Sequence, residues 1–506
     1  MRYLDLVAGP ALRFRDKTAV VGSGRRISFT DLNDRTGRLG RVLRTLGLQP
    51  GARVALLSAN EPEYIEVQAA CLRYGYALVP LNIRLAEREL SFILEDCTPE
   101  VLLVGRKQAE RGVAVGKSLG IDHVFGFGEE PEAPSYERAL AAQAAPSARE
   151  LGADDSVPQD PNLIATILYT SGTTGLPKGA MIDRMAFTAR VLVNNAELHV
   201  GPDDVHMASL PMFHIAAFLA YAHTTTGAAV VMIPDFDAQL ALQMMARERV
   251  TTTVLVPTII SMLLDSRAFA EHDISALRLI IYGGSSIEPG PLRRALAGFG
   301  CQMLQQYGMT ESGASTILRP TDHDPSNALQ LASAGSEAVS FEVLVVDHDE
   351  PVATGDIGEI VCRAPSMMRG YWNRPDETAA ALVGGWMHTG DMGYRDEYGY
   401  LHVTDRRNDM IISGGENVYP REVEAALMEH PRVSDIAVVG IFDERWGEIV
   451  IAVMVDPAPS EDELASWARA RLADYKVPRR WIRVDELPRN ATGKVLKHEL
   501  RTMLRS

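Results

Sequence analysis

YTSGTTGLPKG, residues 169–179, is the most informative segment of this chain of 506 residues. It follows an apolar run at residues 163–168, which predicts a buried strand, and it turns through small and hydroxyl-bearing residues to Lys178. Glycines let a backbone approach a ligand closely, and successive N–H groups in such a turn form a concavity that suits anions. Hydroxyl groups add donors, and Lys178 adds a positive charge. The segment therefore predicts a loop that holds a polyphosphate.

The end of this loop separates it from the P-loop of nucleoside triphosphatases. That pattern ends in Gly-Lys-Ser or Gly-Lys-Thr, whereas here Lys178 is followed by Gly179 and Ala180. A flexible linker is the structural alternative, but linkers do not usually follow a buried strand and end in Pro-Lys-Gly. We therefore expect a phosphate-binding loop of another kind.

Composition and charge restrict the function classes. The chain is 46% hydrophobic and 23% charged, which is ordinary for a soluble globular protein of two or more domains. A net charge of −16 disfavours nucleic acid and anionic membranes as partners, because both demand basic surface. No apolar segment approaches the length of a transmembrane helix, and residues 1–10 carry no signal-peptide pattern. The four cysteines lack CxxC spacing and are expected to be free, mostly buried thiols, so we expect a cytoplasmic protein.

Strand and helix patterns alternate through the first part of the chain and predict a parallel α/β architecture. Helical patterns cover residues 61–74 and 238–249, and residues 126–160 predict a surface excursion with one helix over 136–143. Strands at 341–346 and 359–363 predict a small β-rich subdomain. Further strands are predicted at residues 53–58, 77–81, 101–104, 205–210, 228–233, 251–256 and 277–282.

A short polar segment at residues 405–408 predicts a hinge. The patterns that follow it alternate between helix and strand and predict a compact α+β domain of usual size. The predicted organisation is thus a large N-terminal domain over 1–404, a hinge over 405–408 and a small C-terminal domain over 409–506. The predicted elements of the small domain are helices at 420–429 and 461–472 and strands at 436–440, 449–455 and 481–484.

Two more glycine-containing segments end predicted strands of the large domain. They are YGGSS, residues 282–286, and QYGMTE, residues 306–311. Ligands of open α/β sheets bind beyond the carboxyl ends of strands, so these segments and the phosphate loop indicate one crevice. Tyr307 could stack on a base. Glu311 is a candidate ligand for Mg²⁺, which prefers hard oxygen donors, and a solvated loop acid is the alternative.

Three further residues and one loop are candidates for functional roles, and each taken alone also has an ordinary structural explanation. Asp391 follows a glycine turn and could accept hydrogen bonds from ribose hydroxyls, or form an Asx-turn. His214, in PMFH, could gate an apolar pocket or be a structural histidine. The loop ISGGENVYP, residues 412–420, could face a ligand or merely lead into a helix. Lys494 lies in a small-residue turn, where most lysines are solvated surface groups.

Taken together, these segments closely resemble the acyl- and aryl-CoA synthetases of the ANL superfamily of adenylate-forming enzymes. The matching segments span residues 169–494 in family order, and the 53–82 region is also similar to the family. They are YTSGTTGLPKG, PMFH, YGGSS, QYGMTE, WMHTGD, DRRNDMIISGGENVYP and PRNATGK. The resemblance implies an α/β fold with a large N-terminal ANL-type domain and a small, mobile C-terminal α+β lid.

The resemblance also implies the reaction. A carboxylic acid and ATP give acyl-AMP and pyrophosphate, and the thiol of coenzyme A then displaces AMP. The small domain, carrying the catalytic Lys494, swings about the hinge between the two steps. Alternatives are an acyl-AMP ligase that loads a carrier-protein thiol, an inactive paralogue that binds nucleotide or acyl ligands, and, more remotely, a luciferase-like oxidative second step. The sequence does not decide which acid is used. It does not decide the oligomeric state either, and a homodimer is possible.

Site residues carry over position by position. Lys494 would bridge the acyl carboxylate and the α-phosphate, Thr310 would touch that phosphate, and Glu311 would bind Mg²⁺. His214 would sit at the gate between the acyl and thiol routes. The β- and γ-phosphates would be held by Thr170, Ser171, Gly172, Thr173, Thr174, Gly175 and Lys178. The residues implied for the rest of the nucleotide and for coenzyme A are Gly284, Ser285, Ser286, Gln306, Tyr307, Gly308, Met309, Asp391, Arg406, Ser413, Gly414 and Gly415.

The sequence departs from the family pattern at the run 182–185 after the phosphate loop, where many relatives have a Thr-His-Arg-type run, and at two single positions. The hinge residue is Asn408, where Asp or Lys is common, and Asn tolerates left-handed dihedral angles well enough to act as a hinge. Gln306 stands where relatives often carry a small residue that lines the acyl pocket. If its amide points into that pocket, a plain alkyl chain fits less comfortably, because a buried amide needs a hydrogen-bond partner. A substrate with a ring or a polar group is then favoured; the alternative is that Gln306 turns away.

Overall fold

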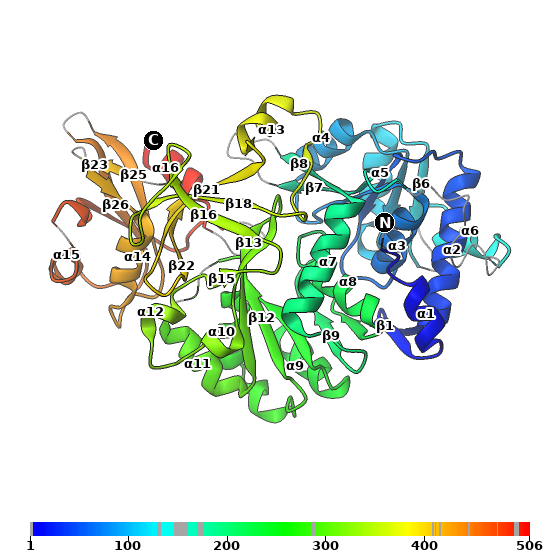
Figure 1. Ribbon diagram of the computed structural model, residues 1–506, viewed down its shortest axis with the longest axis horizontal. Helices are drawn as coiled ribbons and strands as arrows, with labels where there is room; N and C mark the ends of the chain where they lie inside the picture. Colours follow the sequence, from blue (N-terminus) through cyan, green and yellow to red (C-terminus); the bar gives the residue numbers. More distant parts are fainter. Residues whose placement is uncertain are drawn as a thin grey trace.

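The computed structural model describes residues 4–128, 133–145, 160–170, 177–285, 287, 289–406, 409, 411–413, 416–443, 446–472, 474–489 and 495–505. Figure 1 shows a large body and, at its left end, the C-terminal part of the chain. Four sheets organise the residues that the structure describes. Among the described residues, no helix combines the length and the apolar character needed to cross a bilayer.

Two large sheets form the N-terminal body. The seven-stranded sheet has the order β19 (Gly370–Tyr371), β8 (Lys178–Asp183), β7 (Ile164–Thr170), β4 (Ala77–Pro80), β3 (Arg53–Leu57), β5 (Val101–Val104) and β6 (His123–Gly126). The nine-stranded sheet has the order β15 (Ser336–Glu337), β14 (Gly313–Leu318), β13 (Gln302–Met309), β12 (Leu279–Gly283), β11 (Thr252–Leu255), β9 (Val205–Ala208), β10 (Ala229–Met232), β1 (Thr18–Gly22) and β2 (Arg25–Ser28).

Helices separate and flank these sheets, so that helical and sheet layers alternate (Figure 1). The largest apolar core joins both sheets through helices that lie between them, chiefly α2 (Phe29–Thr45), α3 (Glu63–Tyr74), α7 (Arg184–Leu198) and α8 (Ala217–Thr226). The far face of the nine-stranded sheet is covered by α9 (Ala238–Arg247), α10 (Pro257–Asp265) and α11 (Pro289–Phe299). The far face of the other sheet is covered by α4 (Glu87–Cys97) and α5 (Ala109–Ser118).

The predicted α/β fold class is confirmed, with a correction to strand direction. Strands β3, β4, β5, β6 and β7 run parallel as expected, but β8 returns antiparallel to β7, with Thr170 opposite Lys178. Likewise β14 returns antiparallel to β13. Each antiparallel return follows a segment with a predicted ligand role in the chain, so each segment comes where two antiparallel strands follow one another. The sequence indicated the first strand of each pair and not its return.

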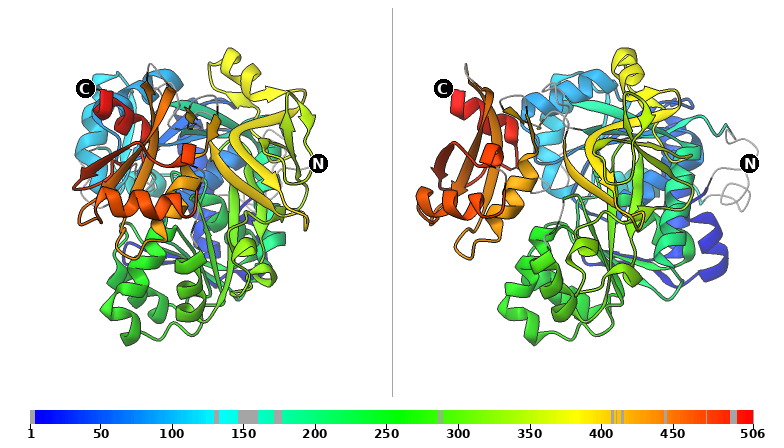
Figure 2. Two further views of the ribbon diagram at one scale, coloured as in Figure 1. Left: turned by 90° about the vertical axis from the view of Figure 1, so that its left-hand side faces the viewer. Right: turned by 60° about the vertical axis from the view of Figure 1, so that its left-hand side comes forward.

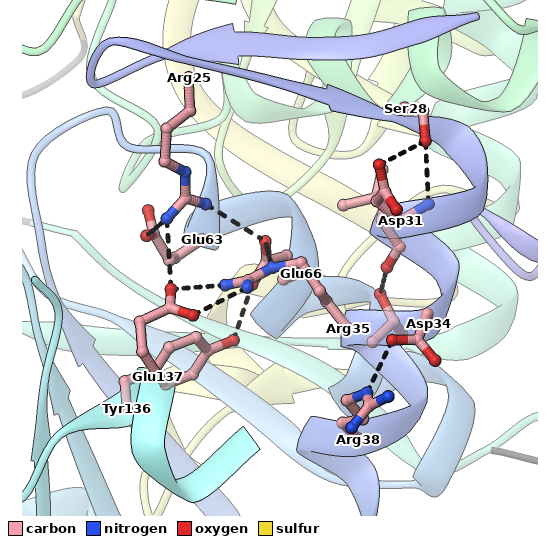
Figure 3. A network of polar contacts seen from close by, with 12 residues as sticks. Arg25, Ser28, Asp31, Asp34, Arg35, Arg38, Glu63, Glu66, Tyr136 and Glu137 are labelled. Atoms are coloured by element: carbon pink, nitrogen blue, oxygen red, sulfur yellow. Dashed lines mark hydrogen bonds and ion pairs between the residues drawn. The ribbon is translucent and has the colours of Figure 1, made fainter. Parts of the chain in front are cut away.

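The segment predicted as a surface excursion is tied into the body. Its helix α6 (Tyr136–Ala141) buries Tyr136, and burial of this kind is inconsistent with a purely surface segment. Figure 3 shows the polar contacts that fix α6 to α2 and α3. Arg35 donates to Glu66 at 2.6 Å and to Glu137 at 2.8 Å, and the Tyr136 hydroxyl donates to Glu66 at 2.9 Å. The pKa of Glu137 is lowered because Arg35 and Arg25 outweigh the effect of its burial.

The predicted β-rich subdomain is a six-stranded sheet beside the two large ones. Its strands are β17 (Glu350–Pro351), β16 (Glu342–Asp347), β18 (Gly358–Arg363), β21 (Trp386–Arg395), β20 (Leu382–Val383) and β22 (Leu401–Arg406). The backbone of Asp405 and Arg406 belongs to β22, whereas Arg407 and Asn408 of the predicted hinge lie outside the described residues.

The C-terminal part of the chain has its own sheet and its own apolar cores (Figure 2). Its strands are β24 (Glu416–Val418), β23 (Ile411–Ser413), β26 (Gly447–Val455), β25 (Ile436–Asp443) and β27 (Arg480–Val484). Helices α14 (Pro420–Met428) and α15 (Glu461–Arg469) contribute to one apolar core, and α16 (Lys497–Arg505) contributes to another. In the described residues, each apolar core lies either before or after residues 405–408. This division supports the two-domain hypothesis, whose boundaries remain a prediction.

Candidate active site

Three residues from distant parts of the chain meet at the β7–β8 hairpin. Lys178 opens β8, and its ammonium group lies 5.6 Å from the centre of the Tyr371 ring. The Tyr371 hydroxyl donates to Glu311 Oε1 at 2.8 Å. The structure therefore brings the predicted phosphate-holding lysine and the predicted magnesium ligand into contact with one tyrosine. Of the loop itself, Thr170 and Lys178 are described, and the intervening Ser171, Gly172, Thr173, Thr174 and Gly175 lie outside the described residues.

Glu311 is not a solvated loop acid, because only 6% of it is exposed. Its backbone carbonyl accepts from the Met368 N–H at 2.7 Å, which fixes the segment that carries it. No group of three or more potential metal-ligating side chains occurs in the described part of the chain. One protein carboxylate is nevertheless compatible with Mg²⁺, which commonly takes one or two carboxylates and completes its shell with phosphate oxygens and water. Glu311 thus fits the predicted role, which remains a prediction.

Tyr307 and Asp391 form a second contact of the site. The Tyr307 hydroxyl donates to Asp391 Oδ2 at 2.8 Å, and the Asp391 N–H donates to Thr389 Oγ1 at 3.1 Å. Burial, reinforced by the Asp391 carboxylate, raises the pKa of the Tyr307 hydroxyl. Across the strand pair, the backbone of Arg406 lies opposite Asp391. The two predicted ribose-binding positions are therefore neighbours, and Asp391 is oriented by the residue predicted to contact the base.

Glycines at the strand ends are required by close backbone approaches. A Cβ at Gly283 would lie 2.4 Å from the Gln306 carbonyl oxygen, and a Cβ at Gly308 would lie 1.9 Å from that of Gly313. Gly284 has φ of +78°, a conformation that L side chains rarely adopt. These residues and Met309, which ends β13, are at the carboxyl ends of adjacent parallel strands, as predicted. Ser285 is exposed at the same edge, and Ser286 is outside the described part of the chain.

Arg190 was missed by the sequence analysis and organises the QYGMTE segment. It lies on α7, and its guanidinium donates to the carbonyls of Thr310 at 2.9 Å, Glu311 at 3.0 Å and Ser366 at 2.8 Å. The same group lies 5.3 Å from the centre of the Phe218 ring. Burial lowers the pKa of Arg190 to about 9, so the side chain stays charged at neutral pH. An arginine directly between the apolar residues Ala189 and Val191 was the signal, but its distant partners were not readable.

A cavity of about 460 Å³ adjoins these strand ends. Its wall is mostly apolar and comes from α7, the PMFH segment, α10 and the strands β11 to β13. Gly283, Gly284, Gly308 and Arg190 also line it, so the cavity and the predicted nucleotide site share a boundary. The apolar residues of the wall include Ile83, Val193, Leu210, Phe213, Ile215, Phe218, Leu219, Ile233, Phe236, Val256, Ile259, Met262 and Phe341.

His214 and Gln306 are both in this wall. The His214 ring packs against Phe213 with its centre 4.6 Å away, and its buried Nε2 has no hydrogen-bond partner in the described residues. Burial, with a smaller contribution from Arg84, lowers the pKa of His214 to about 4, so the ring is neutral at pH 7. Gln306 does not turn away: its Nε2 donates to Asn194 Oδ1 at 2.9 Å. Asn194 is a second residue that sequence reasoning missed.

The small-domain candidates are only partly described. Ser413 is buried in β23, where its backbone pairs with Gly447. Gly414, Gly415 and Lys494 are not among the described residues. Their predicted roles beside the pantetheine chain and the α-phosphate therefore remain predictions.

Comparison with known proteins identifies the family. Residues 9–372 match the family described as AMP-binding enzyme, and residues 422–494 match the AMP-binding enzyme C-terminal domain. The chain is 37% identical to a feruloyl-CoA synthase of Amycolatopsis over 99% of both chains. It is 38% identical to an indoleacetate–CoA ligase of Aromatoleum aromaticum, over 96% of this chain and 95% of that protein.

Solved structures agree with these sequence matches. The amide bond synthetase McbA of Marinactinospora thermotolerans is similar with a TM-score of 0.90 at 31% identity, covering 98% of this chain and 99% of that one. ATP-bound MatB of Rhodopseudomonas palustris is similar with a TM-score of 0.88 at 30% identity, covering 100% and 99%. The chain therefore belongs to the AMP-binding enzyme family and, as its motifs predicted, to the acyl- and aryl-CoA synthetases of the ANL superfamily.

Proposed function

We propose that this protein is an ATP-dependent carboxylic acid–CoA ligase. The observation that carries the proposal is the apolar cavity that shares Gly283, Gly284 and Gly308 with the predicted nucleotide site. An acid whose body fills this cavity would present its carboxylate to a nucleotide bound at the strand ends. An acid cavity that borders a nucleotide site is the arrangement needed to join an acid to the α-phosphate of ATP.

In the first step the carboxylate oxygen attacks the α-phosphorus, and the bond from that phosphorus to pyrophosphate breaks. Both reactants are anions, so positive charge must be positioned where negative charge accumulates. Lys178 and the loop before it hold the pyrophosphate end, and Thr310 and Lys494 contact the α-phosphate. Glu311 would hold Mg²⁺, which would supply charge neutralisation to the phosphates. Arg190 keeps Thr310 and Glu311 in place through their carbonyls.

In the second step the sulfur of coenzyme A attacks the acyl carbonyl, and the bond to AMP breaks. Lys494 must leave before the thiol can enter, which a rotation about residues 405–408 accomplishes. Ser413, Gly414 and Gly415 then line the pantetheine route. His214 borders the acid cavity as a neutral ring and adds no charge to the path of the thiol.

Lys494→Ala tests the division of labour between the two steps. Loss of one preorganised charge is expected to slow acyl-AMP formation by about 10²–10³-fold. Thioester formation from supplied acyl-AMP is expected to change much less, because Lys494 has left the site by then. The two half-reactions are measured as pyrophosphate–ATP exchange and as loss of free thiol. Lys497→Ala is the matched control, because Lys497 pairs with Glu424 at 3.0 Å.

Other outcomes of the same assays favour the alternatives. Equal loss of both half-reactions in Lys494→Ala contradicts the assigned role. Pyrophosphate release without thiol consumption favours transfer to a carrier-protein thiol. Absence of exchange with every acid, from short aliphatic through aryl to long-chain, favours an inactive ligand-binding paralogue.

A further inference from the structure

We propose that the cavity takes aryl acids whose ring carries an O–H or N–H donor, and that the side-chain carbonyl of Gln306 accepts this hydrogen bond. The inference rests on the proposed ligase function and names its substrate class. It starts from the polar pair, Asn194 and Gln306, in an otherwise largely apolar wall.

The direction of the hydrogen bonds in this pair is fixed by a backbone group. Asn194 Nδ2 donates to the Arg190 carbonyl at 3.0 Å, one turn earlier on α7. A backbone carbonyl can only accept, so Asn194 must turn its amide nitrogen toward it and its oxygen toward Gln306. Gln306 must then present its own NH₂ group to Asn194. The group that Gln306 has left for a ligand is its carbonyl oxygen Oε1, which accepts hydrogen bonds and cannot donate them.

This oxygen is available. No donor contacts Gln306 Oε1 in the part of the chain that the structure describes, and the half-buried side chain lines the cavity. Three other polar side chains of the wall already have protein partners, whereas the buried Nε2 of His214 has none in the described residues. Asn60 donates to the carbonyls of Ala208 and Leu210, and the Ser366 hydroxyl donates to the Ser312 carbonyl. The Arg190 guanidinium is engaged by three carbonyls.

These contacts discriminate between classes of acid. A purely alkyl acid would cover Gln306 Oε1 and displace water from it. Because the alkyl chain offers this oxygen no hydrogen bond in return, binding is disfavoured. A ring donor would satisfy the oxygen while the ring faces fill the apolar wall, which includes Phe213, Phe218 and Phe341. A second carboxylate would gain little from Arg190, whose donors are directed at backbone carbonyls. The cavity volume of about 460 Å³ lies in the usual range for small-molecule sites.

Matched acids test the inference on the wild-type protein. Indole-3-acetate is compared with 1-benzothiophene-3-acetate, in which sulfur replaces N–H, and 4-hydroxycinnamate with 4-methylcinnamate. For at least one pair, kcat/KM in pyrophosphate–ATP exchange is expected to favour the donor acid by tenfold or more, equivalent to about 1.4 kcal/mol. In Gln306→Met the kcat/KM values of the two acids in that pair are expected to differ by no more than about twofold. In Gln330→Met the ratio is expected to stay as in wild type, because Gln330 contacts Tyr400, outside the cavity wall.

Equal kcat/KM within both pairs overturns the inference, as does a preference that survives Gln306→Met. Should Gln306→Met fail to fold, Asn194→Leu, which removes the partner that orients Gln306, is expected to reduce the same ratio. Exchange with alkyl acids alone overturns the inference and leaves the ligase function standing. Calorimetric binding of the same pairs in the presence of ATP separates the two proposals further. Preferential binding of donor acids without any exchange supports the inference and contradicts the ligase function.

Discussion

At the residue scale, Tyr371 joins the two charged groups predicted to handle the triphosphate. Its ring faces the Lys178 ammonium group, and its hydroxyl donates to Glu311 Oε1. A hydrogen bond of this kind fixes the orientation of a carboxylate before the metal arrives. Tyr371 is therefore a positioning residue for the predicted Mg²⁺ ligand.

Tyr371→Phe removes the hydroxyl and keeps the ring beside Lys178. Because groups behind a metal ligand typically contribute 10–100-fold to metal affinity, the Mg²⁺ concentration for half-maximal exchange is expected to rise about tenfold. The measurement is a Mg²⁺ titration of pyrophosphate–ATP exchange at saturating ATP. Tyr398→Phe, in a side chain that is 73% exposed, is the control and is expected to leave the titration unchanged. An unchanged titration in Tyr371→Phe would show that its hydroxyl does not position the ligand.

Individual site residues were predictable where a local pattern reveals them. Glu311, Asp391 and Gly308 stand in short motifs, and the structure places Gly308 in the cavity wall, Asp391 beside Tyr307 and Glu311 beside Tyr371, while their roles stay predictions. Arg190 and Asn194 had weaker signals, as polar residues in a helix with a buried face. Their roles depend on contacts more than 100 residues away, which no local pattern specifies.

At the element scale, strands β9 and β11 and helix α8 enclose two histidines. His206 and His223 stack with ring centres 4.2 Å apart, and Thr252 contacts Nδ1 of His206 at 3.0 Å and Nε2 of His223 at 2.8 Å. His223 Nδ1 lies 2.7 Å from the Leu219 carbonyl, an acceptor, so this nitrogen carries the proton. Both rings are fully buried and neutral in the folded protein.

This pair predicts a loss of stability in mild acid. Burial lowers the pKa of His223 to about 4, so between pH 6.5 and 4 the unfolded chain binds a proton that the folded chain does not. The group's contribution to stability is therefore complete above about pH 6.5 and is lost as the pH falls toward 4. At pH 5 the loss from His223 is expected to be about 2 kcal/mol. Burial lowers the pKa of His206 too, which adds to the effect.

Urea unfolding between pH 5 and 8 checks this prediction. His223→Gln is expected to flatten the dependence of the free energy of unfolding on pH over this range, whatever its effect at pH 8. His348→Gln is the control, because the His348 side chain is 94% exposed. If the free energy of unfolding depends on pH equally in His223→Gln and in the wild type, a buried neutral His223 is not the source of that dependence.

Helices and strands were predictable where their burial in the protein leaves a recognisable pattern of apolar residues. The strand β5 has the predicted bounds, because a strand covered on both faces is a continuous apolar run. The return strands β8 and β14 were not predicted, since each mixes polar and apolar residues instead of forming a continuous apolar run. The burial of α6 was not predicted either. It depends on an ion-pair cluster whose members come from three helices (Figure 3).

At the scale of the whole molecule, the apolar cores divide between the N-terminal body and the C-terminal domain. Domains with separate cores commonly unfold separately. Differential scanning calorimetry is therefore expected to resolve two transitions. ATP with Mg²⁺ is expected to stabilise the larger transition, by about 2.7 kcal/mol at a hundredfold excess over Kd, because most of the predicted nucleotide contacts are in the N-terminal body. GTP at the same concentration is the control for non-specific binding.

A single cooperative transition would contradict independent domains. Two transitions that ATP shifts equally would instead indicate that nucleotide contacts both domains in the resting protein.

The overall layered arrangement followed from the alternation of strands and helices in the sequence. The orientation of the C-terminal domain did not, because the sequence specifies each core and not the interface between them.

The position of Arg190 and Asn194 on one helix has an evolutionary consequence. Arg190 anchors the backbone beside the predicted phosphate site, and Asn194, one turn later, orients the side chain that we propose contacts the acid. On this proposal, selectivity and reactivity depend on successive turns of α7. Descendants of this chain can change the acids they accept by mutation at Asn194. Arg190, in the preceding turn, can stay unchanged and preserve the reaction. For directed evolution, the structure recommends a library that varies positions 193, 194 and 306 and leaves position 190 unchanged.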